Sequence, residues 1–403
     1  MLYIHGGGLL TGSAEQADGK ELASKNNVVL VAMNYRLNGF GFFAHPAISA
    51  ASPSAPTNFG ILDQRMAMKW VRQNIKNFGG NPNNVTIFGY SSGGISVLAH
   101  MASQASKSMF DKAIALSGAW YPKGRTLKQA EESGVIDSQK WGCAGNEINT
   151  LECLRSQPIN RIVQASPPPG EYEFVPLVDG KLLNQAPDAA FRKGEFSKVP
   201  FITSATSDEY GLYLFDLGEQ TKDTFAQTIA DYLSPYADRK IPPADIVKEY
   251  KLDQYKSPTK VLSSAVTDFM IACQQLKTAE NMVKYNPDIW AFQFSAKSNP
   301  KPNFDVPVWF GDIGNFHGVD HPYYFGNFDQ PVSKDINELA ITLRSYLSNF
   351  ARTSNPNGNG AAVWKRLSES PDTVLNASTP IDPNWNAKKQ HHCSFWADYE
   401  LQL

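Results

Sequence analysis

The feature that most constrains the fold is a serine flanked by glycines at the junction of an expected strand and an expected helix. The stretch 89–93 reads Gly-Tyr-Ser-Ser-Gly; residues 85–88 before it have the short apolar pattern of a buried strand, and residues 94–101 open a helix. Glycine at both ends allows a turn so tight that larger side chains would collide. Such a turn pushes the Ser91 hydroxyl out above a parallel sheet, at the N-terminus of the helix.

The first third of the chain alternates strand-like and helix-like segments. Residues 2–4 and 28–35 read as strands, and the second, largely β-branched and aliphatic, reads as a strand covered on both faces. The stretch 63–77 carries apolar residues near helical spacing, namely Met66, Trp70, Val71 and Ile75. Strand and helix in alternation predict an α/β fold built of parallel βαβ units with right-handed crossovers.

The middle of the chain is less regular and more helical. Residues 220–255 and 265–285 read mostly as helices, and residues 290–295 read as a strand. No internal repeat is visible in the 403 residues. We therefore expect one domain over residues 1–403, with a helical insertion over about 212–285.

Composition excludes several classes of function. Hydrophobic residues make up 42% and charged residues 19% of the chain, as in a globular protein, and the net charge is −2. No dense run of Lys and Arg is present to neutralise phosphates, so nucleic acid is not an expected partner. The longest aliphatic run, residues 28–33, is far shorter than the ~20 apolar residues that span a bilayer. No transmembrane segment is expected.

The four cysteines form no Cys-x-x-Cys pair, so zinc binding is unsupported, and we expect neither a metal nor a cofactor. Their even number is typical of two disulfides in an oxidising compartment. Four buried free thiols in a cytosolic protein fit the composition equally well.

A run of glycines after the first strand is the second chemical motif. Residues 5–8 read His-Gly-Gly-Gly. Consecutive glycines let backbone N–H groups approach a substrate oxygen without side chains in the way. A phosphate-binding loop would end in Lys-Ser or Lys-Thr, and residues 9–11, Leu-Leu-Thr, do not. Together the two motifs predict a hydrolase with Ser91 as nucleophile and an oxyanion hole formed by the N–H groups of Gly7, Gly8 and Ser92.

The sequence resembles the type B carboxylesterase family, which also holds the cholinesterases and the large fungal lipases. The resemblance runs over nearly the whole chain and is carried by residues 34–37, 39–41, 58–65, 78–82, 85–89, 174–180 and 350–352. It implies the α/β-hydrolase fold, with a central, mostly parallel, twisted sheet and helical insertions. It also implies a serine esterase or lipase that forms an acyl-enzyme on apolar carboxylic esters, whether small molecules or lipids. The alternative is a protein or fragment of the same fold that has little or no activity and acts in binding or adhesion.

The resemblance also implies the acid of a catalytic triad. The family's acid is a Glu in an Asp-Glu-Gly segment after a strand, and here residues 207–211 read Ser-Asp-Glu-Tyr-Gly after the apolar residues 199–202. Glu209 is therefore the expected acid. Because Tyr210 separates it from the glycine, Asp208 remains the fallback.

The expected base is His317, because residues 315–318, Asn-Phe-His-Gly, resemble the family's His-Gly segment. The other histidines rank lower. His5 belongs to the oxyanion turn, and His45 and His100 precede the acid in the chain order Ser, acid, His. The remaining three are His321, which precedes a proline, and His391 and His392, which read as part of a polar tail.

The resemblance implies that Cys143 pairs with Cys153 and that Cys273 pairs with Cys393. The second disulfide would close a loop of about 120 residues, worth roughly 4–5 kcal/mol in the chain-entropy model. Asn376 heads an Asn-Ala-Ser sequon that reads as a loop, so we expect glycosylation there; a sequon at Asn84 enters a strand and is discounted. For the parent protein these features imply the secretory pathway or the extracellular space, although the chain as given opens without a signal peptide.

The chain departs from the family in three places. Tyr90 stands where the family usually has Glu, and Ser92 stands where it usually has Ala. The family's opening strands, which come before the oxyanion glycines, are absent from this chain. We therefore expect residues 28–33 to form an exposed hydrophobic sheet edge, and the chain to be part of a longer one or to need help to fold.

Substrate preference is the least constrained prediction. Several apolar residues could line an acyl pocket, and each could equally belong to the core. They are Leu9, Leu10, Trp120, Tyr213, Leu214 and Phe215.

Overall fold

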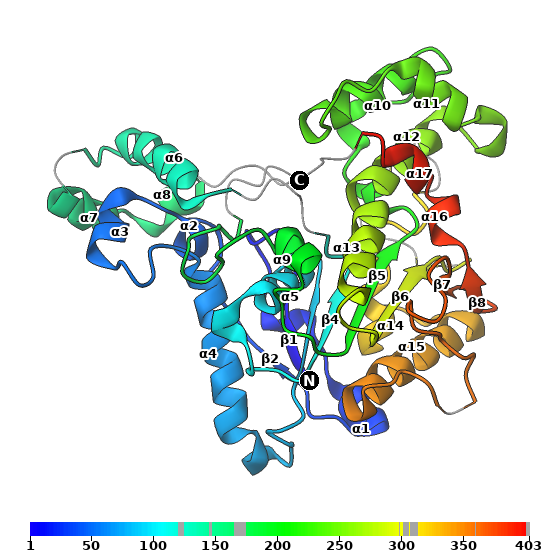
Figure 1. Cartoon of the computed structure of the whole chain (residues 1–403), viewed down its shortest axis with the longest axis horizontal. Coiled ribbons are helices and arrows are strands. Elements are labelled where there is room, and N and C mark those ends of the chain that lie inside the picture. Colours follow the sequence, from blue (N-terminus) through cyan, green and yellow to red (C-terminus); the bar gives the residue numbers. More distant parts are fainter. Residues whose placement is uncertain are drawn as a thin grey trace. The chain divides into compact units, whose positions relative to one another are not determined.

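The structure is a computed structural model, and it describes residues 1–119, 125–144, 147–164, 175–297, 299–300, 306, 313–358 and 360–399. The chain forms two compact units (Figure 1). The first comprises Met1–Ala17, Val29–Ala115 and Pro122–Val199, and the second comprises Asp18–Val28, Leu116–Tyr121 and Pro200–Leu403. In the part of the chain that is described, no helix combines the length and apolarity needed to cross a membrane.

The sheet of the first unit carries the two sequence motifs. Strand β1 (Leu2–Ile4) runs parallel to β2 (Val31–Ala32) on one side and to β3 (Thr86–Tyr90) on the other, and β4 (Lys112–Leu116) comes next in the order. Every side chain of β1 and β3 is buried, as expected for short continuous apolar strands.

Two helices of the first unit pack on this sheet. Helix α4 (Phe59–Asn74) contacts β1, and α5 (Ser92–Ala102) contacts both β1 and β3. Of the apolar residues that predicted the first of these helices, Val71 and Ile75 are buried, but Met66 is 67% and Trp70 44% exposed. The other helices of this unit are α2 (Asn38–Phe42), α3 (Pro46–Ala51), α6 (Leu127–Lys140), α7 (Glu147–Ser156), α8 (Ile159–Gln164) and α9 (Pro187–Lys193).

The expected strand at residues 28–35 is only partly formed. Hydrogen-bonded pairing is limited to β2, the outermost strand at its end of the order, and residues 28–32 are half exposed. The prediction that both faces are covered was therefore wrong for residues 28–32, because covered faces require elements packed above and below the strand and would leave these side chains buried. The expectation of a partly exposed apolar edge agrees with the structure.

The second unit has its own run of strands. Strands β5 (Phe201–Thr206), β6 (Ile289–Phe294) and β7 (Val374–Ala377) are parallel, and β8 (Asp382–Trp385) is antiparallel to β7. All side chains of β5 and β6 are buried. Together with the strands of the first unit, the described residues form eight strands, mostly parallel, as the α/β-hydrolase prediction requires.

Between β5 and β6 the described elements are all helical. They are α10 (Phe225–Leu233), α11 (Pro243–Glu249), α12 (Pro258–Thr267) and α13 (Cys273–Val283), and one π-helical turn, Asp268–Ala272, joins the last two. The remaining helices of this unit are α1 (Lys20–Asn26), α14 (His321–Phe325), α15 (Lys334–Thr353), α16 (Ala387–Gln390) and α17 (Cys393–Trp396).

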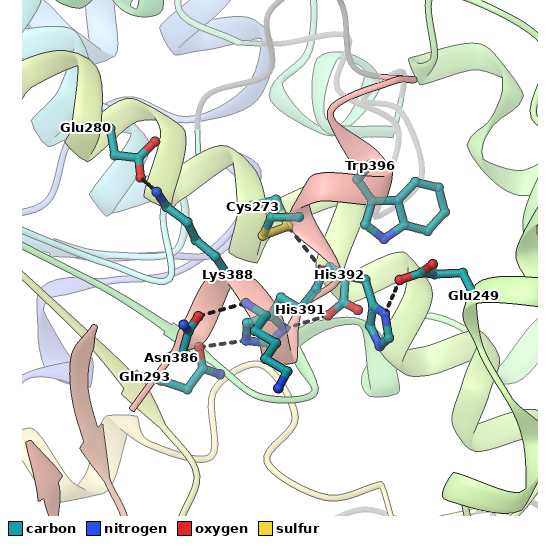
Figure 2. Close-up of a disulfide and its surroundings, with 12 residues drawn as sticks. Glu249, Cys273, Glu280, Gln293, Asn386, Lys388, His391, His392 and Trp396 are labelled. Carbon is teal, nitrogen blue, oxygen red and sulfur yellow. Dashed lines mark hydrogen bonds and ion pairs between the residues drawn. A yellow bond between two sulfur atoms is a disulfide. The ribbon is translucent and has the colours of Figure 1, made fainter. Parts of the chain in front are cut away.

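Both disulfides implied by the family resemblance are present, Cys143–Cys153 and Cys273–Cys393. Figure 2 shows the second, which ties α17 to the start of α13. Beside it lies His391, whose side chain contacts Gln293 of β6.

Two sequence expectations about the last third of the chain were wrong. His391 does not lie in a polar tail: it is 4% exposed, and its Nδ1 is 2.5 Å from the Asp268 carboxylate. Asn376 does not lie in a loop: it is a half-buried residue of β7, and its side-chain oxygen accepts a hydrogen bond from Ser295.

Candidate active site

The serine of the sequence motif occupies a strained turn between β3 and α5. Ser91 has φ 58° and ψ −125°, which L side chains rarely adopt, and it caps the N-terminus of α5. A Cβ on Gly89 would lie 2.2 Å from the Gly93 carbonyl oxygen, and a Cβ on Gly93 would lie 2.0 Å from the Ile4 carbonyl oxygen. Both glycines are therefore required for β3, β1 and α5 to approach this closely.

The glycine run lies directly against this turn, within the same unit. A Cβ on Gly6 would lie 3.0 Å from the Ser91 Cβ, so the two segments touch. Gly7 and Gly8 have φ of +115° and +65°, values that glycine adopts without strain. A Cβ added to Gly8 would have no heavy atom within 4 Å, so the space beside Gly8 is open. The glycine loop therefore lies against the nucleophile turn, and the Leu9 N–H at its end donates to Ser92 Oγ at the start of α5 at 3.1 Å.

The expected acid and base form a pair within the second unit. Glu209 follows β5 and is completely buried. Its carboxylate accepts the Thr206 N–H at 2.7 Å and lies 2.5 Å from His317 Nδ1, and the His317 N–H donates to the Glu209 carbonyl at 3.3 Å. A proton on Nδ1 donates to the carboxylate, which leaves Nε2 as the basic nitrogen.

The fallback acid has a different place. One Asp208 oxygen accepts the Asn315 N–H at 2.9 Å, the Asp208 N–H donates to the Asn315 carbonyl at 3.2 Å, and Lys260 of α12 forms an ion pair with the other carboxylate oxygen. Asp208 therefore ties the loop of Glu209 to the loop of His317. The carboxylate that pairs with the His317 imidazole is that of Glu209.

A second carboxylate near the base was missed from the sequence. Asp320 is completely buried, accepts the Tyr324 hydroxyl at 2.5 Å and lies three residues after His317. Burial lowers the pKa of the His317 imidazole, but the charge and hydrogen bond of Glu209 and the charge of Asp320 outweigh it, so this pKa is raised above 6.5. The sequence did contain a signal for this contact, because Asp320 follows the expected base His317 by only three residues.

Other histidines are held in structural roles. Burial lowers the pKa of His100 to about 3, and its ring bonds Gln64 and Ser106. His45 accepts the Ala47 N–H and caps α3. Burial also lowers the pKa of His321, to about 4. In the described part of the chain, no three His, Cys, Asp or Glu side chains are grouped to hold a metal ion.

The apolar pocket candidates separate by exposure. Tyr213 is 44% exposed, and its ring centroid is 5.7 Å from that of His317, so it can contact a substrate. Leu9 and Leu214 are buried in the core. Leu10 and Phe215 are half buried, and Trp120 lies outside the described residues.

Comparisons with known proteins agree on one family. A family model described as the carboxylesterase family matches residues 1–396. Acetylcholinesterase of Bungarus fasciatus is 29% identical over 434 residues, covering 100% of this chain and 69% of the relative. A solved PNB esterase shares 28% identity at a TM-score of 0.78, covering 98% of this chain and 81% of its own. A thermophylic PNB esterase shares 29% identity at the same TM-score, and the match covers 98% of this chain and 80% of that esterase.

Proposed function

The chain belongs to the carboxylesterase family of carboxylic ester hydrolases, and we propose that it hydrolyses esters through an acyl-enzyme formed on Ser91. The observation that carries this proposal is the backbone of Ser91. Ser91 combines φ 58° with ψ −125°, outside the left-handed helical region, and lies between a buried strand and a helix N-terminus next to glycines that admit no Cβ, which is the strained geometry of a nucleophile turn.

In the proposed mechanism, the Glu209–His317 pair supplies the proton transfers. His317 Nε2 takes the Ser91 proton as Oγ attacks the ester carbon, and then gives it to the leaving alcohol. Glu209 holds the imidazole in the tautomer with Nδ1 protonated and stabilises its charged form. Water repeats the sequence on the acyl-enzyme and releases the acid.

The negative charge of each tetrahedral intermediate is assigned to the glycine loop. The proposed donors are the backbone N–H groups of Gly7, Gly8 and Ser92, aided by the positive end of the α5 dipole. We place the substrate among apolar carboxylic esters, of small molecules or of lipids. The two disulfides support an oxidising compartment, as in the secretory pathway.

A fluorophosphonate probe tests the nucleophile directly. The folded chain is expected to bind one probe per molecule, with the added mass on the peptide that contains Ser91. Ser91→Ala should remain unlabelled. Ser103→Ala, which removes another buried hydroxyl at the end of α5, should be labelled normally. A folded wild-type chain that takes no label would contradict the proposal and favour a binding protein of the same fold. Rates on p-nitrophenyl esters from short to long acyl chains then give the acyl preference, with Ser91→Ala as the blank.

The pH profile should report the raised pKa of His317. A general base must be neutral to act, so kcat/KM is expected to fall as pH drops through a pKa above 6.5. Glu209→Gln removes the charge that raises this pKa, so the acid limb should move to lower pH while kcat falls. The exposed carboxylate of Glu338 on α15 provides the control, since Glu338→Gln should leave the limb in place. A wild-type limb below pH 6.5 would contradict the raised pKa, and a limb that stays in place in Glu209→Gln would contradict the assignment of His317 as the base.

A further inference from the structure

Both ends of the glycine loop are connected to one side chain, that of Ser92. After the loop, the Leu9 N–H donates to Ser92 Oγ at 3.1 Å. Before the loop, the Tyr35 hydroxyl donates to the His5 carbonyl at 2.7 Å, and a side-chain hydrogen bond joins Tyr35 to Ser92. The residues of this connection are all buried.

The bond to Leu9 holds a backbone conformation that leucine disfavours. Leu9 has φ 60°, in the left-handed region, which costs an L residue roughly 1–2 kcal/mol. Its carbonyl accepts the Asn38 N–H at 2.7 Å, and its side chain is in the core. The Ser92 hydroxyl therefore supplies an acceptor that helps to keep the residue after Gly8 in the left-handed region.

The bond through Tyr35 anchors the other end of the loop. The Tyr35 ring stacks on the His5 ring with centroids 4.3 Å apart and an interplanar angle of 22°. Burial raises the pKa of the Tyr35 hydroxyl far above neutrality, so the hydroxyl keeps the proton that it donates to His5. The neighbouring Ser92 side chain favours the charged form of this hydroxyl, and Ser92 Oγ, which receives the Leu9 N–H, has one proton that it can give to the Tyr35 oxygen.

We propose that the Ser92 hydroxyl is a positioning group that sets the oxyanion glycines against the nucleophile turn. The inference rests on the proposed function and adds a second role to Ser92, whose backbone N–H is a proposed oxyanion donor. Because Ser92 opens α5 directly after Ser91, one residue couples the position of the nucleophile to that of Gly7 and Gly8.

This coupling should matter most in the transition state. Oxyanion donors act on charge that develops only as the tetrahedral intermediate forms, so a misplaced loop lowers kcat while ground-state binding changes little. Removing one oxyanion donor outright costs about 10²–10³ in kcat. A loop that keeps its donors but is held less firmly should lose about tenfold, which corresponds to about 1.4 kcal/mol.

The test is Ser92→Ala, which keeps the backbone N–H and removes only the hydroxyl. We expect kcat to fall about tenfold with KM within about twofold, and affinity for a trifluoromethyl ketone to weaken in parallel with kcat. This ketone is attacked by Ser91 Oγ, so its oxygen takes the negative charge and the proton passes to His317. Ser103→Ala is the matched control and should change neither kcat nor ketone affinity. A Ser92→Ala chain with wild-type kcat and ketone affinity would overturn the proposal.

Two further variants separate positioning from a general loss of stability. Because Leu9→Gly also removes a buried side chain, it serves as its own reference: Ser92→Ala should lower kcat much less when added to Leu9→Gly than when added to the wild type, since glycine adopts positive φ without the bond. Tyr35→Phe should lower kcat by a similar factor, and the Tyr35→Phe/Ser92→Ala pair should lose less than the product of the two. Two results together would refute the positioning role. The loss of kcat in Ser92→Ala would match the fraction of that variant that is unfolded, and Leu9→Gly would not reduce the loss.

Amide hydrogen exchange gives a readout that needs no activity. The Leu9 N–H should exchange about tenfold faster in Ser92→Ala than in the wild type, since its acceptor is gone. Unchanged exchange would overturn the proposal even in a chain without esterase activity. Absence of fluorophosphonate labelling in a wild type with a protected Leu9 amide would instead contradict the proposed function alone.

Discussion

Ser91→Ala is expected to lower kcat for ester hydrolysis by about a millionfold, and His317→Ala by a similar factor, while the double variant should lose no more than either single one. The physical reason is that the nucleophile and its base act as one unit: a hydroxyl without a base attacks slowly, and a base without a hydroxyl has no proton to take. Rates on a p-nitrophenyl ester, with folding checked by circular dichroism, measure all three variants.

This double-variant comparison matters because Ser91 and the Glu209–His317 pair lie in different units of the fold. A residual rate roughly 10³–10⁴ above the uncatalysed reaction is expected in every variant, because the oxyanion donors remain. Multiplicative losses in the double variant would mean that the two residues act independently, which contradicts a triad.

Replacing both Cys273 and Cys393 with alanine is expected to lower the free energy of unfolding by about 5 kcal/mol in the chain-entropy model. The two cysteines are 120 residues apart in sequence, so their bond removes much of the freedom of the unfolded chain. Urea unfolding, followed by tryptophan fluorescence under non-reducing conditions, measures the loss.

The other disulfide is the matched control. Cys143 and Cys153 are 10 residues apart, and the same model gives about 3 kcal/mol for that separation. The Cys143→Ala/Cys153→Ala variant should therefore lose less stability than the Cys273→Ala/Cys393→Ala variant. Equal losses, or a smaller loss for the long loop, would contradict the entropic explanation.

The parts of the candidate site that could be predicted are local in sequence. Gly7 and Gly8 have positive φ, and Gly6, Gly89 and Gly93 stand where a Cβ would clash, so the pattern of glycines by itself indicates the turn. Local sequence pattern alone could not decide whether Asp208 or Glu209 pairs with the histidine, because the two carboxylates are adjacent. Which one faces His317 depends on contacts with Asn315 and Lys260, far along the chain.

In the fold, too, features that depend on local sequence were predicted, and features that depend on distant contacts were missed. Strands β1, β3 and β6 were expected from their short apolar runs, and the start of β5 was expected only from the family resemblance, whereas β8 alternates exposed and half-buried residues and was not expected. The Asp268–His391 pair was missed because 123 residues separate its members and each sits in a stretch of ordinary composition. Helical spacing on α4 indicated a helix correctly but not which side is buried, since Met66 and Trp70 face solvent.

The segment around α17 has a consequence for how the protein is made. Its Trp396 ring is completely buried, Cys393 bonds to α13, and His391 contacts Asp268 and Gln293 (Figure 2). A chain folds from its N-terminal side as it is synthesised, so the partners of this segment emerge from the ribosome long before the segment does. In that interval Cys273 is a thiol without its native partner, while Cys143 and Cys153 have already been made. If Cys143 and Cys153 pair as soon as both are made, Cys273 has no competing thiol while it waits for Cys393, and the order of synthesis then helps to select the native pairing.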